Sequence, residues 1–494
     1  MCWGLLGFAE PMESLSASYS LSLRMQLMDT PGVLARLCQA IADVGGNISY
    51  VQIHHTGDGI VEQDITVDAR NEAHAEQIRA AVENLDDVRV QGVTDRTFIL
   101  HEGGKLEVVS KTPLVHRDQL SMAYTPGVAR VCNAIAKDDD KVWEYTIKRH
   151  TVAIVTDGTA VLGLGDIGPN ASLPVMEGKA MLFKEFAGID AFPMALNVSS
   201  TQELIDATKA IAPNFGGINL EDIAAPECFE VEETLVRELD IPVFHDDQHG
   251  TAVVVMAALT NALKVVGKEL ADVRVVMTGA GAAGVAITKM LMGRGVKDIT
   301  ACDRTGVLHL GRDGLANNPA KLWLAQHTNL EGRTGTIHDV MPGADVFIGV
   351  SGPGVITVED VAAMARQPIV FALANPDPEI SPEEIKDIAA VIATGRSDYP
   401  NQINNVLAFP GIFKGAMMSG ATRINEEMKQ AAADAIAGVI SDDEVNAGYI
   451  IPSVFDTGVV KAVVASVSAA AQATGVCRPE RAWSEEEEPP SVRV

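Results

Sequence analysis

The sequence predicts an α/β protein in which a small βαββαβ unit precedes a larger region built around a doubly wound parallel sheet. Three observations indicate this fold class. Strand-like alternation and helical periodicity follow one another in the βαββαβ order between Ser18 and Thr97. Apolar strands alternate with amphipathic helices from residue 246 to 435, and one of these strands runs into a glycine-rich turn.

The chain of 494 residues is too long for one hydrophobic core, so we expect several domains. The pattern divides it into a disordered start, the small unit, an α/β segment with most of the candidate chemical groups, the doubly wound domain, C-terminal helices that pack on the core, and a disordered acidic tail. In that order, these segments span residues 1–17, 18–97, 98–245, 246–435, 436–474 and 475–494.

The small unit is predicted in some detail. Its strands are expected at 18–27, at 88–95 and, around the turn Thr56-Gly57-Asp58-Gly59, in two runs within 49–67. Its amphipathic helices are expected within 30–48 and 72–85, the first with Pro31 near its start and Gly45-Gly46 at its end. With its D-x-P-G-V-L and G-G-N-I segments, the unit resembles an ACT domain. The resemblance implies a small effector, such as an amino acid, at a dimer interface, and a ferredoxin-like structural domain without a ligand is the alternative.

Composition and charge exclude several classes of function. The formal net charge of −28 argues against nucleic-acid and anionic-membrane partners, because the field of the chain repels polyanions. The apolar stretches are of strand or helix length, and the start of the chain has no Lys or Arg before its hydrophobic run. The six cysteines form no C-x-x-C pair, so we expect reduced thiols and a cytoplasmic location.

A strand at 273–277, the turn TGAGAAG and the helix after it form a candidate dinucleotide site of the Rossmann type. The G-x-G-x-x-G spacing permits a tight turn, close approach of the backbone to a pyrophosphate, and close packing of helix on strand. The first N–H groups of the helix then face the phosphates. The candidate residues of this turn are Gly279, Gly281, Ala282, Ala283 and Gly284.

An acidic residue at the end of the next strand separates this motif from an ordinary glycine turn. Asp303 stands about 20 residues after the turn, where an acid accepts the hydroxyls of the adenosine ribose. Its charge would repel a 2′-phosphate, which favours NAD. The adjacent Arg304 keeps NADP as an alternative, because an arginine there accommodates that phosphate.

Two carboxylate pairs are candidates for a metal site. Glu221-Asp222 and Asp246-Asp247 each follow a short apolar stretch, and open α/β folds gather their ligand-binding groups at strand ends. Adjacent buried carboxylates repel each other unless a cation neutralises them, and oxygen ligands select Mg²⁺ or Mn²⁺. A helix cap with a solvated acidic turn is the alternative. His245 and His249 could instead indicate zinc.

Tyr124 and Lys179 are candidate acid–base residues. A lysine acts as a base only where burial or a nearby cation lowers its pKa, and a tyrosine can deliver a proton to a carbanion. In isolation, neither assignment is safe, because most lysines are solvated and most tyrosines are packing residues.

Nine ordered motifs, which cover roughly residues 108 to 470, resemble the malic enzymes, and the short bacterial type most of all. They read YTPGVA, TDGTAVLGLGDIG, EGKAMLFK, NLEDI, DDQHGTA, TGAGAAG, GVSGPGVIT, FALANPDPEI and NQINNVLAFPGIF. The resemblance implies oxidative decarboxylation of L-malate to pyruvate with NAD and Mg²⁺ or Mn²⁺. It also fits the expectation of a homodimer or homotetramer, since ACT modules commonly pair.

The resemblance assigns roles residue by residue. It implies Glu221, Asp222 and Asp247 as metal ligands with Asp246 behind them, and Lys179 and Tyr124 as the catalytic base and acid. It further implies that the loop 349–354, with Ser351, lies along the cofactor, and that two asparagines contact malate or the nicotinamide. These are Asn375 and Asn405.

One position departs from the family pattern. Larger malic enzymes carry a substrate-binding arginine where this chain has Ala160, so the group that holds that carboxylate is open. Three functions other than that of a malic enzyme stay open. They are a malolactic enzyme, an ACT-bearing dehydrogenase of amino-acid biosynthesis, and a non-catalytic effector sensor.

Overall fold

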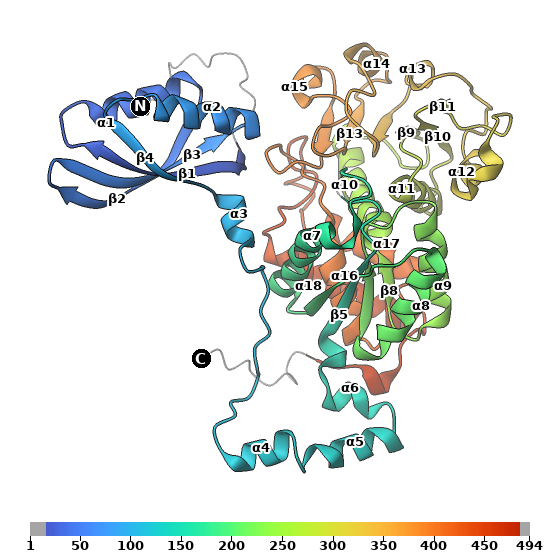
Figure 1. Cartoon of the computed structure of the whole chain (residues 1–494). Helices are drawn as coiled ribbons and strands as arrows, with labels where there is room; N and C mark the ends of the chain where they lie inside the picture. The colour runs from blue at the N-terminus through green and yellow to red at the C-terminus, as the bar shows by residue number, and fades with distance from the viewer. Residues whose placement is uncertain (1–15, 162, 485–494) are drawn as a thin grey trace. The chain divides into compact units, whose positions relative to one another are not determined.

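The computed structural model describes residues 16–161 and 163–484, in two compact units that divide between Lys105 and Leu106 (Figure 1). The first unit extends past residue 97, where the sequence pattern placed its end. The added segment is helix α3 (Arg96–His101), whose first turn is tied to the sheet by a hydrogen bond from Thr97 Oγ1 to Ser18 O of 2.9 Å. The expected disorder of 1–17 is wrong for residues 16 and 17, which begin the first strand (Ser16–Met28), and the expected disorder of 1–15 and 485–494 lies outside the described residues.

The first unit is a four-stranded antiparallel sheet in the order β2-β3-β1-β4 with two helices packed on one face. Alternate residues of β1, from Leu21 to Leu27, are buried with Leu37 and Ile41 of the first helix. The predicted βαββαβ order is confirmed. Its elements are β1 (Ser16–Met28), α1 (Val33–Asp43), β2 (Asn47–Gly57), β3 (Ile60–Ala69), α2 (Glu72–Glu83) and β4 (Val88–Asp95).

The second unit begins with three helices and then forms a four-stranded parallel sheet in the order β6-β5-β7-β8. Strands β5, β7 and β8 are buried at every residue, so they read as short apolar runs without alternation. The elements are α4 (Arg117–Ala123), α5 (Val128–Lys137), α6 (Lys141–Tyr145), β5 (Thr151–Thr156), α7 (Gly168–Leu182), β6 (Asp190–Ala195), α8 (Thr201–Ile211), β7 (Gly217–Leu220), α9 (Glu227–Glu238) and β8 (Val243–His245).

A six-stranded sheet follows in the order β11-β10-β9-β12-β13-β14, parallel except for the pair β10 and β11. This arrangement confirms the predicted Rossmann-type sheet. Its elements are α10 (Thr251–Val266), β9 (Arg274–Thr278), α11 (Ala282–Gly293), β10 (Asp298–Asp303), β11 (Gly306–Val307), α12 (Pro319–His327), α13 (Ile337–Val340), β12 (Val346–Gly349), α14 (Val358–Ala362), β13 (Ile369–Ala372), α15 (Pro382–Ile385) and β14 (Val391–Thr394).

Both sheets of the second unit share one core. Helix α10 is buried over most of its length, together with α16 (Phe409–Met418), α17 (Glu426–Ala437) and α18 (Thr457–Ala473). The ring of Phe413 packs edge-on against Phe183 at 5.4 Å and Phe244 at 5.9 Å, which joins the C-terminal helices to the first sheet. The segment Asp246–Val266 is apolar and long enough to span a membrane, but 72% of its apolar window is buried, as in a core helix.

The expected disorder from residue 475 onward is wrong for 475–484. Cys477 pairs with Ala421 in a β-bridge, a short helix runs over Pro479–Arg481, and the Trp483 indole is buried against His150 at 4.5 Å. The charge run that suggested disorder begins only after Trp483. Burial of the Trp483 side chain holds residues 475–484 against the core.

Candidate functional site

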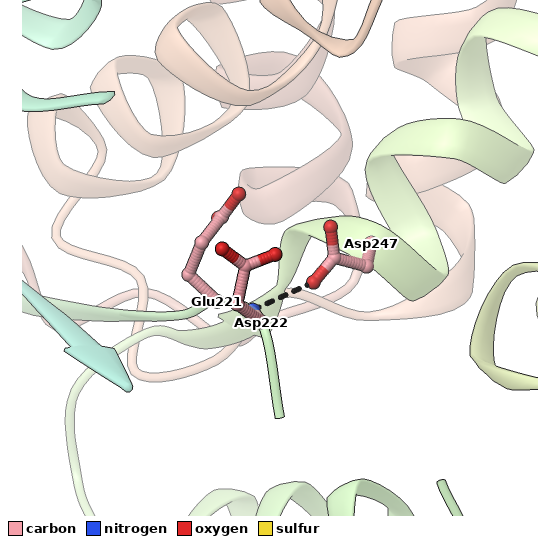
Figure 2. A group of neighbouring side chains, drawn as sticks. All are labelled: Glu221, Asp222 and Asp247. Carbon is pink, nitrogen blue, oxygen red and sulfur yellow. Dashed lines mark hydrogen bonds between the residues drawn. The ribbon is translucent and has the colours of Figure 1, made fainter. Parts of the chain in front are cut away.

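Three carboxylates converge at the carboxyl ends of the strands in the four-stranded parallel sheet β6-β5-β7-β8. Glu221 and Asp222 follow strand β7, and Asp247 follows β8 in the π-helical turn η4 (Asp246–Gly250). One oxygen of each lies within 4.8 Å of the others, and Figure 2 shows the three side chains drawn together. Because β7 and β8 are parallel neighbours, their carboxyl ends meet at the same edge, as the sequence predicted. The arrangement could hold a divalent cation.

One backbone N–H and one side-chain amide donate hydrogen bonds to these carboxylates and fix their orientation. The Asp222 N–H donates to Asp247 Oδ2 at 2.9 Å, and the Asn219 amide donates to Glu221 Oε2 at 2.8 Å. Asp222 itself has a φ of 54°, a left-handed conformation that is strained for a residue with a side chain. Its carbonyl accepts the N–H of Ala160 at 3.0 Å, so the loop that lacks the family's arginine borders the cluster directly.

Lys179, on α7, is the cation next to these carboxylates. Its Nζ lies 2.8 Å from Glu221 Oε1 and 2.6 Å from Asp246 Oδ2, above the Phe409 ring at 4.3 Å. Burial alone would lower the pKa of Lys179, but the charges of Asp246, Glu221 and Asp247 raise it above its usual value. Burial raises the pKa of Glu221 well above its usual value. Asp246 therefore contacts Lys179 directly and stands outside the group of three carboxylates.

Asn405 is the second residue that holds Asp246. Its Nδ2 donates to Asp246 Oδ2 at 3.1 Å, and its Oδ1 accepts from Thr251 Oγ1 at 3.1 Å. The structure therefore brings together Lys179, Asp246 and Asn405, three residues that stand far apart in the sequence.

The two histidines that raised the zinc alternative take no part in the cluster of described residues that could hold a metal. His249 Nε2 lies 2.9 Å from Glu232 Oε2, and the N–H of His245 donates to Glu232 Oε1 at 2.9 Å. Burial opposes ionisation of Glu232, yet His249 with His245 and Lys429 holds its pKa at about 2. Glu232 thus supports the turn that carries Asp247, a role that its position on α9 did not reveal in the sequence.

A cavity of about 850 Å³ lies at the carboxyl ends of the central strands of the six-stranded sheet. The glycine turn between β9 and α11 forms one wall. Gly279 has a φ of 106°, and a side chain there would meet Val350 O at 2.4 Å. A side chain at Gly284 would lie 1.8 Å from Gly279 O, so α11 can approach the turn only without one. The glycine turn therefore presents backbone to the cavity, as close approach of a pyrophosphate requires.

Asp303 lies in this cavity, but it is not alone. Arg312 Nη2 lies 2.7 Å from both carboxylate oxygens, and Lys321 Nζ lies 2.8 Å from Oδ2. Burial opposes the ionisation of Asp303, but hydrogen bonds from Lys321, Thr305 and Arg312 hold its pKa well below the usual range. Sequence reasoning found Asp303 and missed both cations, because nothing in the spacing separates them from solvated lysines and arginines.

Ser351, Gly352 and Arg304 also line the cavity, and Asn375 follows strand β13 at the same edge of the sheet. Tyr124 is placed elsewhere. It ends α4 with 67% of its surface exposed, and Figure 1 shows α4 well apart from α7, which carries Lys179. The structure thus gathers the predicted ligands and lysine but does not bring the predicted tyrosine to them within one chain.

Comparison with known proteins finds family matches for three segments of the chain. Residues 103–236 match the family described as malic enzyme, N-terminal domain, and 248–473 match malic enzyme, NAD binding domain. Residues 15–90 match the ACT domain.

Individual relatives agree over most of the chain. An NAD-dependent malic enzyme of Geobacillus stearothermophilus is 56% identical over 94% of this chain and 96% of its own. A bifunctional malic/malolactic enzyme of Bacillus subtilis is 56% identical over 76% of this chain and 92% of its own. The crystal structure of a malic enzyme from Pyrococcus horikoshii, 49% identical, superposes with a TM-score of 0.73 over 76% of this chain and 88% of that one.

The glycine turn yields a direct test of the cavity. In Gly284→Ala the new methyl must displace α11 from the Gly279 carbonyl, so we expect the Kd for NADH, measured by fluorescence titration, to rise roughly tenfold or more. Gly293→Ala, at the other end of the same helix, is the control, because its methyl would meet only the Gln430 side chain at 3.4 Å. Unchanged NADH affinity in Gly284→Ala would remove the turn from the binding site.

Proposed function

The chain belongs to the malic enzyme family, and from that premise we propose that it converts L-malate to pyruvate and CO₂ while reducing NAD, with a divalent metal ion. The observation that carries this proposal is the three-carboxylate cluster beside a buried lysine, in the same unit as a dinucleotide cavity. Purified protein given malate, NAD and Mn²⁺ should produce NADH and pyruvate in equal amounts. Absence of both products would contradict the proposal.

Glu221, Asp222 and Asp247 would hold the metal. Their oxygens are hard ligands that suit Mg²⁺ or Mn²⁺, and three protein ligands leave positions for the oxygens of water and substrate. When bound, the ion would polarise the C2 oxygen of malate and stabilise the negative charge that develops on loss of CO₂. The crowding of the three carboxylates supports this fit, because without a cation their charges repel.

Lys179 would handle the proton of the C2 hydroxyl. Its Nζ already bridges Glu221 and Asp246, so it lies next to the oxygen ligands on the buried side of the cluster. A divalent charge nearby would offset the carboxylates that raise its pKa, and so make the amine a usable base. Asp246 and Asn405 would keep the amine in place, and hydride would leave C2 for the nicotinamide.

Tyr124 would return a proton to C3, and we propose that it does so in an active site of a second copy. The segment before β5 exposes apolar side chains that a stable monomer would bury. Val108, Val115 and Met122 are each at least two-thirds exposed, and no residue of α4 or α5 is buried. A homodimer or homotetramer, in which this segment packs on a neighbouring copy, accounts for both observations.

NAD is the proposed cofactor, because Asp303 would repel a 2′-phosphate. NADP stays the weaker alternative, because the cations around Asp303 could bind that phosphate. These cations are Arg304, Arg312 and Lys321. We place the protein in the cytoplasm, in keeping with the five described cysteines, all free.

The ACT unit would bind a small effector that adjusts activity. Adding single amino acids to the assay tests that last point, and a rate that none of them alters would contradict it.

A malolactic reaction is the second candidate, because the Bacillus subtilis relative is described as bifunctional. In that reaction NADH is retained and pyruvate is reduced to lactate. The product assay separates the two, since lactate without free NADH would support the malolactic reaction alone.

The proposed metal ligands can be tested in a matched pair. Asp247→Asn should raise the Mn²⁺ concentration for half-maximal activity at least roughly tenfold, because an amide is a weaker ligand than a carboxylate. Glu227→Gln removes an exposed carboxylate at the start of α9, and its Mn²⁺ titration should match the wild type. Identical titrations for Asp247→Asn and the wild type would refute the ligand assignment.

The tyrosine can be tested by separating the two half-reactions. Tyr124→Phe should lose malate turnover by roughly 10²- to 10⁴-fold, the usual contribution of a general acid, while NADH-dependent reduction of oxaloacetate persists. Tyr145→Phe, which alters another exposed tyrosine of the same unit, is the control. Full malate turnover in Tyr124→Phe would exclude the assignment.

A further inference from the structure

Glu379 is a fully buried carboxylate that none of the predicted roles uses. It follows β13 after the Asn375-Pro376 segment and has no exposed surface. Burial raises its pKa, and backbone N–H donors act in the opposite direction. A buried carboxylate is costly unless its oxygens are well satisfied, so its partners indicate its purpose.

The two oxygens of Glu379 bind two different loops. Oε1 accepts the N–H of Ser351 at 2.7 Å and its hydroxyl at 3.2 Å. Oε2 accepts the N–H of Ala374 at 3.1 Å. The carboxylate therefore connects the loop after β12 with the loop after β13, at the point where the backbone pairing of the two strands ends.

Both loops belong to the dinucleotide side of the sheet. Ser351, Gly352 and Pro353 line the cavity together with Gly279 and Gly281. Ala374 directly precedes Asn375. The space for the carboxylate is made by Gly349, where a side chain would come within 2.3 Å of the Glu379 carboxyl carbon.

We infer that Glu379 is a positioning residue for the dinucleotide, because it fixes the loop after β12, which lines the cavity, to the loop after β13, which carries Asn375. The inference rests on the proposed use of NAD. Charge-assisted hydrogen bonds to backbone N–H groups are among the stronger contacts available, and one side chain here fixes both loops in one geometry. Loss of the Ala374 contact leaves a buried N–H without its acceptor, and loss of the Ser351 contact releases a partly exposed loop from the sheet.

Two variants of different chemistry should have the same effect. Glu379→Gln keeps the size of the side chain but turns an NH₂ group toward one of the two donors. Gly349→Ala keeps the carboxylate and pushes it aside. In each, we expect the Kd for NADH to rise about tenfold, while the Mn²⁺ titration stays within about twofold of the wild type.

Asp345→Asn is the matched control. Asp345 accepts the N–H of Arg274 at 2.9 Å and pairs with Lys268 at 2.8 Å, so it also joins neighbouring strands, but at the opposite end of β12. It should lower the melting temperature without changing the Kd for NADH. This control separates loss of stability from loss of cofactor positioning.

Fluorescence titration of NADH and thermal melting of the full-length protein decide between the outcomes. Weaker NADH binding in both variants, with normal Mn²⁺ titration and with normal NADH binding in Asp345→Asn, supports the inference. Should Glu379→Gln fail to fold, Gly349→Ala decides alone. Wild-type NADH affinity in the variants that fold, or an equal loss of Mn²⁺ and NADH binding, overturns it. If the wild type itself binds no NADH, the proposed function fails first.

Discussion

The repulsion among three carboxylates is the constraint on which the catalytic unit depends. Glu221, Asp222 and Asp247 each place an oxygen within 4.8 Å of the others, two of them are buried, and Glu221 pairs with the ammonium group of Lys179. A single ammonium group cannot offset three carboxylates together with Asp246. A divalent ion resolves this imbalance, and it also frees the lysine from part of the negative charge that surrounds it.

The fold explains how such an arrangement is held. Parallel strands β7 and β8 end side by side, so residues far apart in the sequence meet without a long loop. Around them, Asn219 donates to Glu221, Glu232 accepts the backbone N–H of His245, and Asn405 shares Asp246 Oδ2 with Lys179. The dinucleotide site follows the same rule at the second sheet, where the glycine turn and Asp303 end neighbouring strands.

Local patterns made much of this predictable. The βαββαβ unit, the glycine turn and the carboxylates at strand ends each depend on short-range periodicity or spacing, and the structure places them accordingly. Contacts between segments that are distant in the sequence could not be predicted from local patterns. Nothing local marks Arg312 as a partner of Asp303, or Glu379 as a link between two loops. Trp483 reversed the expectation of disorder because one buried ring outweighs its polar surroundings. Tyr124 shows a further limit, since the sequence motif suggested its role but not that it would lie exposed at the end of α4.

The most direct measurement is the anomalous diffraction of crystals of the full-length protein grown with Mn²⁺ and malate. The account predicts one manganese peak within coordination distance of oxygens from Glu221, Asp222 and Asp247. Diffraction that places these side chains apart with no peak between them, or a peak bound instead to His245 or His249, would contradict it.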